Sequence, residues 1–185
     1  MINAIWAEDR NGLIGFNDEL PWDLPRELQH FKKVTDNNII VMGRKTYDSM
    51  GKRSLPNRTT VVLTRNKKYK IKNGLVFNTL EECLDWYKSQ DKDMFVIGGA
   101  EIIKAFEPHI ELIYRTVIQQ VFLGDTYFPK DFNLDNFEKL SETRRYLQDK
   151  NNEHEFIVYK YLMCELNHTK RKLVSICDFW TAGKD

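Results

Sequence analysis

The sequence lacks the features that mark several classes of protein. Its 28 basic and 27 acidic side chains leave a formal net charge of +1 over 185 residues, so no overall charge draws the chain to nucleic acid or to an anionic membrane. It has no apolar run near the roughly 18 residues that a membrane span needs, and its N-terminus lacks the basic and apolar regions of a signal peptide. We therefore expect a cytoplasmic protein with no nucleic-acid or membrane partner.

The cysteines and histidines lack the spacing of disulfide frameworks and of metal sites. The three cysteines, Cys83, Cys164 and Cys177, form no C-x-x-C pair, and none of the four histidines stands at ligand spacing from them. Free thiols are the rule in the reducing cytosol. The sequence therefore predicts neither a disulfide nor a bound metal ion.

What the sequence does contain is enough apolar material for one core, at 42% of its residues with 12% aromatics. A length of 185 residues is typical of a single domain. Short β-branched and apolar runs predict buried strands at residues 2–7, 38–43, 59–64, 75–77 and 94–98. Helical patterns occur at residues 24–35, 47–50, 80–89 and 100–106, the third opened by a capping box at Thr79 and Glu82.

This alternation of strand and helix predicts an α/β fold with a mostly parallel central sheet. The later runs at residues 110–122, 137–140 and 154–162 have strand composition and predict an antiparallel C-terminal part. For residues 163–185 two alternatives stay open, a terminal element packed on the body and a loosely ordered tail.

The chain is organised around residues 12–35, where a glycine-containing loop, a rigid segment with two prolines and a short amphipathic helix follow one another. Pro25 suits the first helical position, so Glu27 occupies the first turn. On a helical wheel Glu27 lies about 40° from Phe31, at the border of the apolar stripe.

Two interpretations of Glu27 follow. A solvated acid would be favoured there by the helix dipole. Alternatively, a carboxyl held between Trp22, Leu28 and Phe31 would orient a polar heterocycle in an otherwise apolar slot, which is the usual composition of a small-molecule site.

Three predicted strands end in residues suited to an anion. Gly43-Arg-Lys-Thr46 follows one strand, Thr64-Arg-Asn66 the next and Gly98-Gly99 the third. Ligands of open parallel sheets bind beyond the carboxyl ends of the strands, so we expect one edge that grips an extended phosphorylated ligand. A basic surface turn is the alternative for the first of these segments. The chain has neither G-x-G-x-x-G nor GxxxxGK[ST], which disfavours a Rossmann enzyme and a P-loop NTPase.

Eight motifs, taken together, resemble the dihydrofolate reductase family, in the family's order and over residues 1–162. The motifs are Leu13-Ile-Gly15, Leu20-Pro-Trp22, Leu24-Pro-x-Glu-Leu-x-x-Phe31, Met42-Gly-Arg-x-Thr46, Ser49-x-Gly51, Leu55-Pro-x-Arg58, Ile97-Gly-Gly-x-Glu-Ile102 and Gly124-Asp-Thr-x-Phe128. The resemblance implies a single-domain, three-layer α/β sandwich with flanking helices over residues 1–162, and leaves residues 163–185 as a C-terminal extension of unknown role.

The resemblance also implies an activity, the NADPH-dependent reduction of 7,8-dihydrofolate to 5,6,7,8-tetrahydrofolate in one-carbon metabolism. Hydride would pass from C4 of the nicotinamide to C6 of the pterin while N5 takes a proton from water, and residues 11–23 would form a lid. It further implies a monomer that binds antifolates such as methotrexate and trimethoprim.

On the substrate side, the resemblance assigns the catalytic network to Glu27, Trp22 and Thr116. Glu27 would hydrogen-bond the pterin amino group and N3, Thr116 would share this network through water, and Arg58 would pair with the substrate α-carboxylate, a geometry that suits Arg better than Lys. The apolar walls around the pterin and benzoyl rings would be Ile5, Ala7, Leu28, Phe31, Met50, Leu55 and Ile97.

On the cofactor side, the resemblance assigns NADPH contacts to a larger set, with Arg44 and Arg65 as partners of the 2′-phosphate. The set comprises Ala7, Ile14, Gly15, Gly43, Arg44, Lys45, Thr46, Leu63, Thr64, Arg65, Gly98, Gly99, Ala100, Ile102 and Thr126. Three positions depart from the common pattern, since Ile103 replaces a tyrosine, Glu101 an arginine and Leu20 a methionine of many relatives.

Two other functions fit parts of the sequence. A related NADPH reductase acting on another pterin-like or riboflavin-pathway intermediate would share the cofactor edge but would need no clamp at Arg58. A nucleic-acid-binding protein would use the basic segments Lys67-Lys68 and Lys170-Arg-Lys172. The near-neutral charge and the absence of nucleic-acid-binding motifs argue against this second alternative.

Overall fold

A computed structural model of the chain describes residues 1–140 and 144–165. The alternatives left open for the C-terminal stretch therefore fall almost entirely outside the described residues. Within the described part, no helix has the length and apolar character needed to cross a bilayer.

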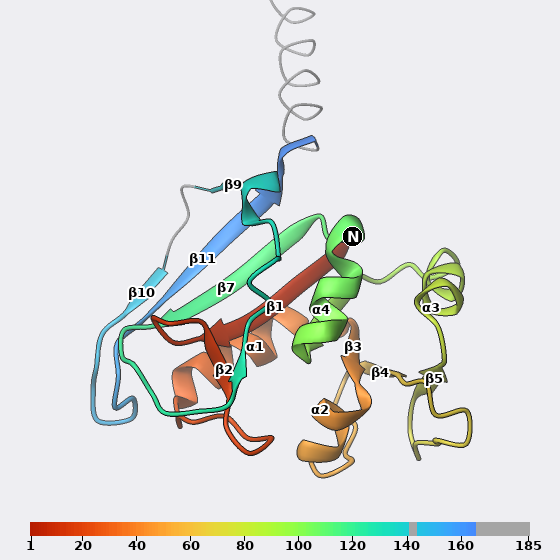
Figure 1. The fold of residues 1–185 in the computed structure, drawn as a ribbon, viewed down its shortest axis with the longest axis horizontal. Coiled ribbons are helices and arrows are strands. Elements are labelled where there is room, and N and C mark those ends of the chain that lie inside the picture. Colours follow the sequence, from red (N-terminus) through yellow and green to blue (C-terminus); the bar gives the residue numbers. More distant parts are fainter. Residues whose placement is uncertain (141–143, 166–185) are drawn as a thin grey trace, which may run out of the picture.

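The centre of the molecule is a nine-stranded sheet in the order β10-β11-β7-β1-β6-β3-β4-β5, with β9 paired to β11 (Figure 1). Its strands are β1 (Ile2–Glu8), β3 (Ile39–Gly43), β4 (Thr59–Leu63), β5 (Leu75–Phe77), β6 (Met94–Gly98), β7 (Leu112–Ile118), β9 (Phe137–Lys139), β10 (Arg144–Tyr146) and β11 (Phe156–Met163). All pairs from β7 to β5 are parallel, whereas β11 runs antiparallel to β7, β9 and β10. The predicted mostly parallel sheet with an antiparallel C-terminal part is confirmed.

Helices cover both faces of this sheet. They are α1 (Pro25–Thr35), α2 (Arg44–Ser49), α3 (Leu80–Tyr87) and α4 (Ala100–Phe106), with 3-10 turns at Glu107–His109 and Leu134–Asn136. Figure 1 shows α4 in front of the sheet and α1 behind it. The predicted capping box is present, because the Thr79 hydroxyl accepts from the Glu82 amide and the Glu82 carboxylate accepts from the Thr79 amide.

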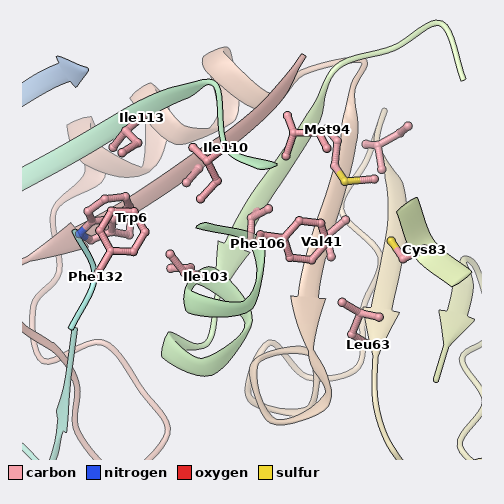
Figure 2. Packing of buried hydrophobic residues seen from close by; sticks show 14 of the residues in the cluster. Trp6, Val41, Leu63, Cys83, Met94, Ile103, Phe106, Ile110, Ile113 and Phe132 are labelled. Carbon is pink, nitrogen blue, oxygen red and sulfur yellow. The ribbon is translucent and has the colours of Figure 1, made fainter. Parts of the chain in front are cut away.

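The core lies on both faces because successive side chains of β1 point in opposite directions. Ala4 and Trp6 join the cluster that includes Phe106 of α4, whereas Ile5 joins the cluster against α1. Figure 2 shows the first cluster, with the Phe106 ring beside β3 and β6. Each fully buried aromatic or aliphatic side chain of this kind stabilises the fold by about 1.5–3 kcal/mol.

The structure differs from the predicted elements in three places. The strand expected at residues 110–122 is shorter, Leu112–Ile118. Beyond its end, the Phe122 ring packs on Trp22 and the Phe122 amide donates to the Asp9 side chain. The helix expected at residues 47–50 begins earlier, directly after Gly43. A separate ribbon of β2 (Leu13–Gly15) and β8 (Thr126–Tyr127), and the edge strand β10, were not predicted.

Candidate functional site

The Glu27 carboxyl is buried at the start of α1. Pro25 stands at the beginning of the helix, as predicted, and no side chain caps it. Only 9% of Glu27 is exposed. The alternative of a solvated surface acid is therefore wrong, and the acid faces the interior of the molecule.

Thr116 of β7 is the hydrogen-bond partner of this acid. Its Oγ1 donates to Glu27 Oε1 over 3.4 Å, and Thr116 itself is 1% exposed. Burial raises the pKa of Glu27 to about 7, because the ionised form loses its hydration, and the Thr116 hydrogen bond opposes this only in part. At neutral pH the carboxyl is therefore divided between its protonated and ionised forms.

Trp22 lies against the same end of the sheet with an unused donor. Its indole N–H is buried and has no hydrogen-bond partner among the described residues. The ring packs on Phe122 at a centroid distance of 5.4 Å. A buried donor without an acceptor is costly, so this N–H is available to a water molecule or to a polar ligand atom.

Most of the predicted apolar walls gather into one cluster on the α1 face. Four of them are partly buried and pack against a core group that includes the buried Ile5; they are Phe31, Met50, Leu55 and Ile97. Ala7 packs instead beside Trp22, and Leu28 remains 49% exposed on α1. The walls thus come from β1, α1, β6 and the segment after α2.

Arg58 approaches α1 from the segment before β4, with its side chain 6% exposed. Its Nε donates to Thr35 Oγ1 over 2.9 Å, and its two Nη groups donate to the carbonyls of Pro56 and Lys32. Asp36 Oδ1 lies 3.8 Å from Nη1. A guanidinium has five N–H donors, so two remain, which is the number that a bidentate carboxylate uses.

The glycines that were predicted to contact the cofactor stand where β3 and β6 end, and Leu63 ends the neighbouring β4. Strand register places Gly43 beside Leu63, and Met42 beside Gly98. A methyl group on Gly43 would lie 3.0 Å from Ile102 Cγ1 and 3.7 Å from the Gly99 amide. Gly43 therefore lets α4 approach the end of β3, and the Gly98–Gly99 peptide between β6 and α4 is cis.

A pocket of about 430 Å³ adjoins this edge, at α2. It is lined by Asp18, Arg44, Lys45, Asp48 and Ser49. Arg44 Nη1 donates to Asp48 Oδ2 over 3.2 Å, and the Tyr69 hydroxyl donates to the other oxygen of Asp48 over 2.5 Å. Asp48 therefore orients Arg44 and offsets part of its charge, so the Lys45 ammonium is needed to make the pocket attractive to an anion.

The remaining predicted cofactor residues are more dispersed. Thr46 lies within 3.6 Å of a methyl placed on either Gly98 or Gly99, whereas Arg65 is exposed beyond β4, where Thr64 follows the strand. Ala100 opens α4 directly behind the glycine pair. Ile103, where relatives place tyrosine, is buried in the core cluster and does not face the edge.

The ribbon of β2 and β8 brings the loop residues to the same edge. Gly15 pairs with Thr126, and a methyl on Gly15 would lie 3.4 Å from Thr126 Cβ. Asp125 Oδ2 accepts the Asn17 amide over 3.1 Å. Asp125 has no predicted role, although it stands inside the motif Gly124-Asp-Thr-x-Phe128.

The substrate-side and cofactor-side residues meet at Ala7. Ala7 is paired with Thr116, the partner of Glu27, and β1 lies between β7 and β6, the strand that ends at Gly98. Three features of this region suit the phosphates of a dinucleotide. They are the glycine edge, by which we mean Gly43, Gly98 and Gly99 at the ends of β3 and β6, the uncapped starts of α2 and α4, and the cations Arg44 and Lys45 at α2. The residues present therefore fit NADPH, which Gly43, Arg44, Lys45, Gly98 and Gly99 would hold.

Comparison with known proteins gives one family. The family model described as dihydrofolate reductase matches residues 1–162. A dihydrofolate reductase of Lactococcus lactis subsp. lactis (strain IL1403) is 48% identical over 163 residues, 87% of this chain and 96% of that protein. One of Bacillus subtilis (strain 168) is 38% identical over 161 residues, 86% and 94% of the two chains.

A solved structure of the same family is also similar to this chain. The dihydrofolate reductase from Enterococcus faecalis, complexed with NADP(H) and RAB-propyl, superposes with a TM-score of 0.85 at 38% identity. The match covers 89% of this chain and 96% of that one.

The buried acid predicts a pH-dependent cost in stability. Because burial raises the pKa of Glu27 from 4.5 to about 7, the unfolded chain holds fewer protons between these values, and stability falls as pH rises through this window. Glu27→Gln removes the ionisation, so we expect it to raise the free energy of unfolding by about 3 kcal/mol at pH 8 and by far less at pH 4.5. Urea unfolding at both pH values measures the difference.

The exposed Glu81 on α3 provides the control. Glu81→Gln should change the free energy of unfolding by less than about 0.5 kcal/mol at either pH. A Glu27→Gln effect of equal size at pH 4.5 and pH 8 would contradict the assigned ionisation.

Proposed function

The chain belongs to the dihydrofolate reductase family, and we propose that the cleft at the carboxyl ends of β1, β3, β6 and β7 carries out that family's reaction. The enzyme reduces 7,8-dihydrofolate to 5,6,7,8-tetrahydrofolate with NADPH, a step of one-carbon metabolism. The observation that carries the assignment of the site is the buried Glu27 carboxyl, hydrogen-bonded to Thr116 and set next to the glycine edge.

Glu27 binds and orients the pterin ring. Its carboxyl accepts from the pterin amino group and N3, and Thr116 completes the set of donors around it. A pKa of about 7 lets the carboxyl ionise on contact with a ring that supplies two donors. The indole N–H of Trp22, which needs an acceptor, holds a water molecule in this network. Such a water is the immediate source of the proton that N5 takes up.

Arg58 binds the glutamate tail of the substrate. Its internal hydrogen bonds to α1 and to the Pro56 carbonyl fix the guanidinium plane, which leaves two donors for the α-carboxylate. Between the two anchors, the apolar cluster around Ile5 and Phe31 receives the pterin and benzoyl rings.

The residues of the glycine edge hold the cofactor. NADPH, when bound, supplies the hydride. Gly43, Gly98 and Gly99 allow close approach of backbone, and Arg44 and Lys45 attract the phosphates at α2. The exposed Arg65 adds charge for the 2′-phosphate, which favours NADPH over NADH.

The family binds dihydrofolate and antifolates. For this chain we extend the proposal to methotrexate and trimethoprim as ligands of the pterin site, to a monomer and to the cytoplasm as its compartment. Glu27 supports the drug assignment, because a diaminopyrimidine presents donors of the same type as the pterin.

The proposed reaction is tested by the loss of NADPH absorbance when dihydrofolate is added to the purified chain. We expect turnover that requires both substrates and stops with methotrexate. NADPH oxidation that is indifferent to dihydrofolate would reject the assignment, and salt-sensitive binding of oligonucleotides without oxidation would favour the nucleic-acid alternative.

Glu27→Gln should lower turnover at neutral pH by about 100-fold, because the amide offers one acceptor and no charge to the pterin. The dissociation constant of NADPH should change by less than about twofold, since the side chain lies outside the cofactor edge. Steady-state kinetics and cofactor fluorescence titration separate the two quantities. Unchanged turnover would disprove the role of Glu27.

Arg58→Ala should weaken dihydrofolate binding by about 10- to 100-fold, the value of a paired charged hydrogen bond, with a smaller effect on NADPH. Arg58→Lys should recover only part of the loss, because an ammonium cannot bind bidentately. A dihydropterin without glutamate is the matched control and should bind all three proteins alike. Equal losses for both dihydrofolate and NADPH would contradict the clamp.

A further inference from the structure

Asp9 lies between the loop that follows β1 and the loop that follows β7. It follows β1 directly, and it is fully buried, with 0% of its surface exposed. The strands β1 and β7 are parallel neighbours and end side by side (Figure 1). The loop after β1 leads to the predicted lid, and the loop after β7 leads to the β8 ribbon.

One carboxylate oxygen of Asp9 shapes the first loop. Oδ1 accepts the amide of Asn11 over 2.7 Å and that of Leu13 over 2.9 Å. The Asp9 carbonyl also accepts the Gly12 amide over 3.1 Å, and Gly12 has φ +78°. This is an Asx-type turn that a local Asp often makes, and by itself it would assign Asp9 only a local structural role.

The second oxygen reaches the other loop. Oδ2 accepts the amide of Phe122 over 2.9 Å, across 113 residues of sequence. The neighbouring Arg10 amide donates to the Gln120 carbonyl over 3.2 Å. One buried carboxylate therefore holds three backbone amides and joins loops that are far apart in the chain.

The position of Phe122 matters for the site. Its ring packs on Trp22 at 5.4 Å and meets the edge of His154 at 5.1 Å. Trp22 carries the buried N–H that has no partner among the described residues and that we assign to the pterin network. Contacts thus run from the Asp9 carboxylate to the Phe122 backbone, and from the Phe122 ring to Trp22.

We propose that Asp9 is a positioning residue for the reductase reaction, which ties the loops after β1 and β7 together and places Trp22 through the Phe122 ring. This inference rests on the proposed function. It requires the carboxylate specifically, because three amides converge on two oxygens. An asparagine offers one acceptor and sets an NH₂ group against one of the amides.

The test is the rate of a single turnover, measured when dihydrofolate is mixed with the enzyme–NADPH complex. Asp9→Asn should lower this rate by about tenfold, since a small displacement of a positioning group is costly for an oriented reaction. In a Phe122→Ala background the same substitution should lower it by less than about twofold, because the link to Trp22 is already absent. A role limited to stability would leave the rate unchanged in both backgrounds, and an effect that does not pass through Phe122 would give the same factor in both.

Glu82→Ala serves as the matched control. It also removes a carboxylate that accepts two backbone amides, at the start of α3, and it should lower the unfolding midpoint but leave the single-turnover rate unchanged. If Asp9→Asn does not fold, Phe122→Ala alone decides, and an unchanged rate in that variant overturns the proposal.

These experiments distinguish failure of the positioning role of Asp9 from failure of the proposed function. An active wild-type enzyme with equal Asp9→Asn factors in both backgrounds, or with no rate loss, rejects the positioning role alone. A wild-type chain without turnover of dihydrofolate rejects the proposed function and the role of Asp9 with it.

Discussion

The proposed site depends on the burial of one carboxyl group, that of Glu27. Glu27 is withdrawn from water at the start of α1 with a single threonine hydroxyl beside it, so its pKa rises to about 7. An acid left in that state destabilises the fold when it ionises, because desolvation of a charge is not offset by one neutral donor. A ligand with two further donors relieves the deficit. In the proposed function, the unfavourable burial of this acid in the free protein is the source of its affinity for a pterin.

The sheet makes this arrangement possible. Parallel register aligns the ends of β1, β3, β6 and β7 at one edge, where backbone amides are not all used by the ladder. α1 then sets its acid against one face, while the glycines after β3 and β6 open the edge for a second ligand. Because the same strands carry both halves of the proposed site, that site needs no second domain to bring its two ligands together.

Much of this follows from sequence, for identifiable reasons. Continuous apolar runs predict buried parallel strands, and Pro25 predicts the start of α1, which places Glu27 near Phe31 on the helix. Helical periodicity did not decide between the solvated and the buried acid, since that depends on β7, a strand 89 residues away. The β2–β8 ribbon was missed because strands of three and two residues carry too little pattern.

The contacts of Asp9 are likewise only partly predictable from the sequence. Its turn with Asn11 and Gly12 is local and has a recognisable composition, but the bond to the Phe122 amide depends on which strands become neighbours. That bond also stabilises the loops beside the proposed site. These loops must exclude water for Glu27 to remain buried, but loops are generally held by few contacts. A carboxylate shared between both loops supplies fixed contacts where the sheet has ended.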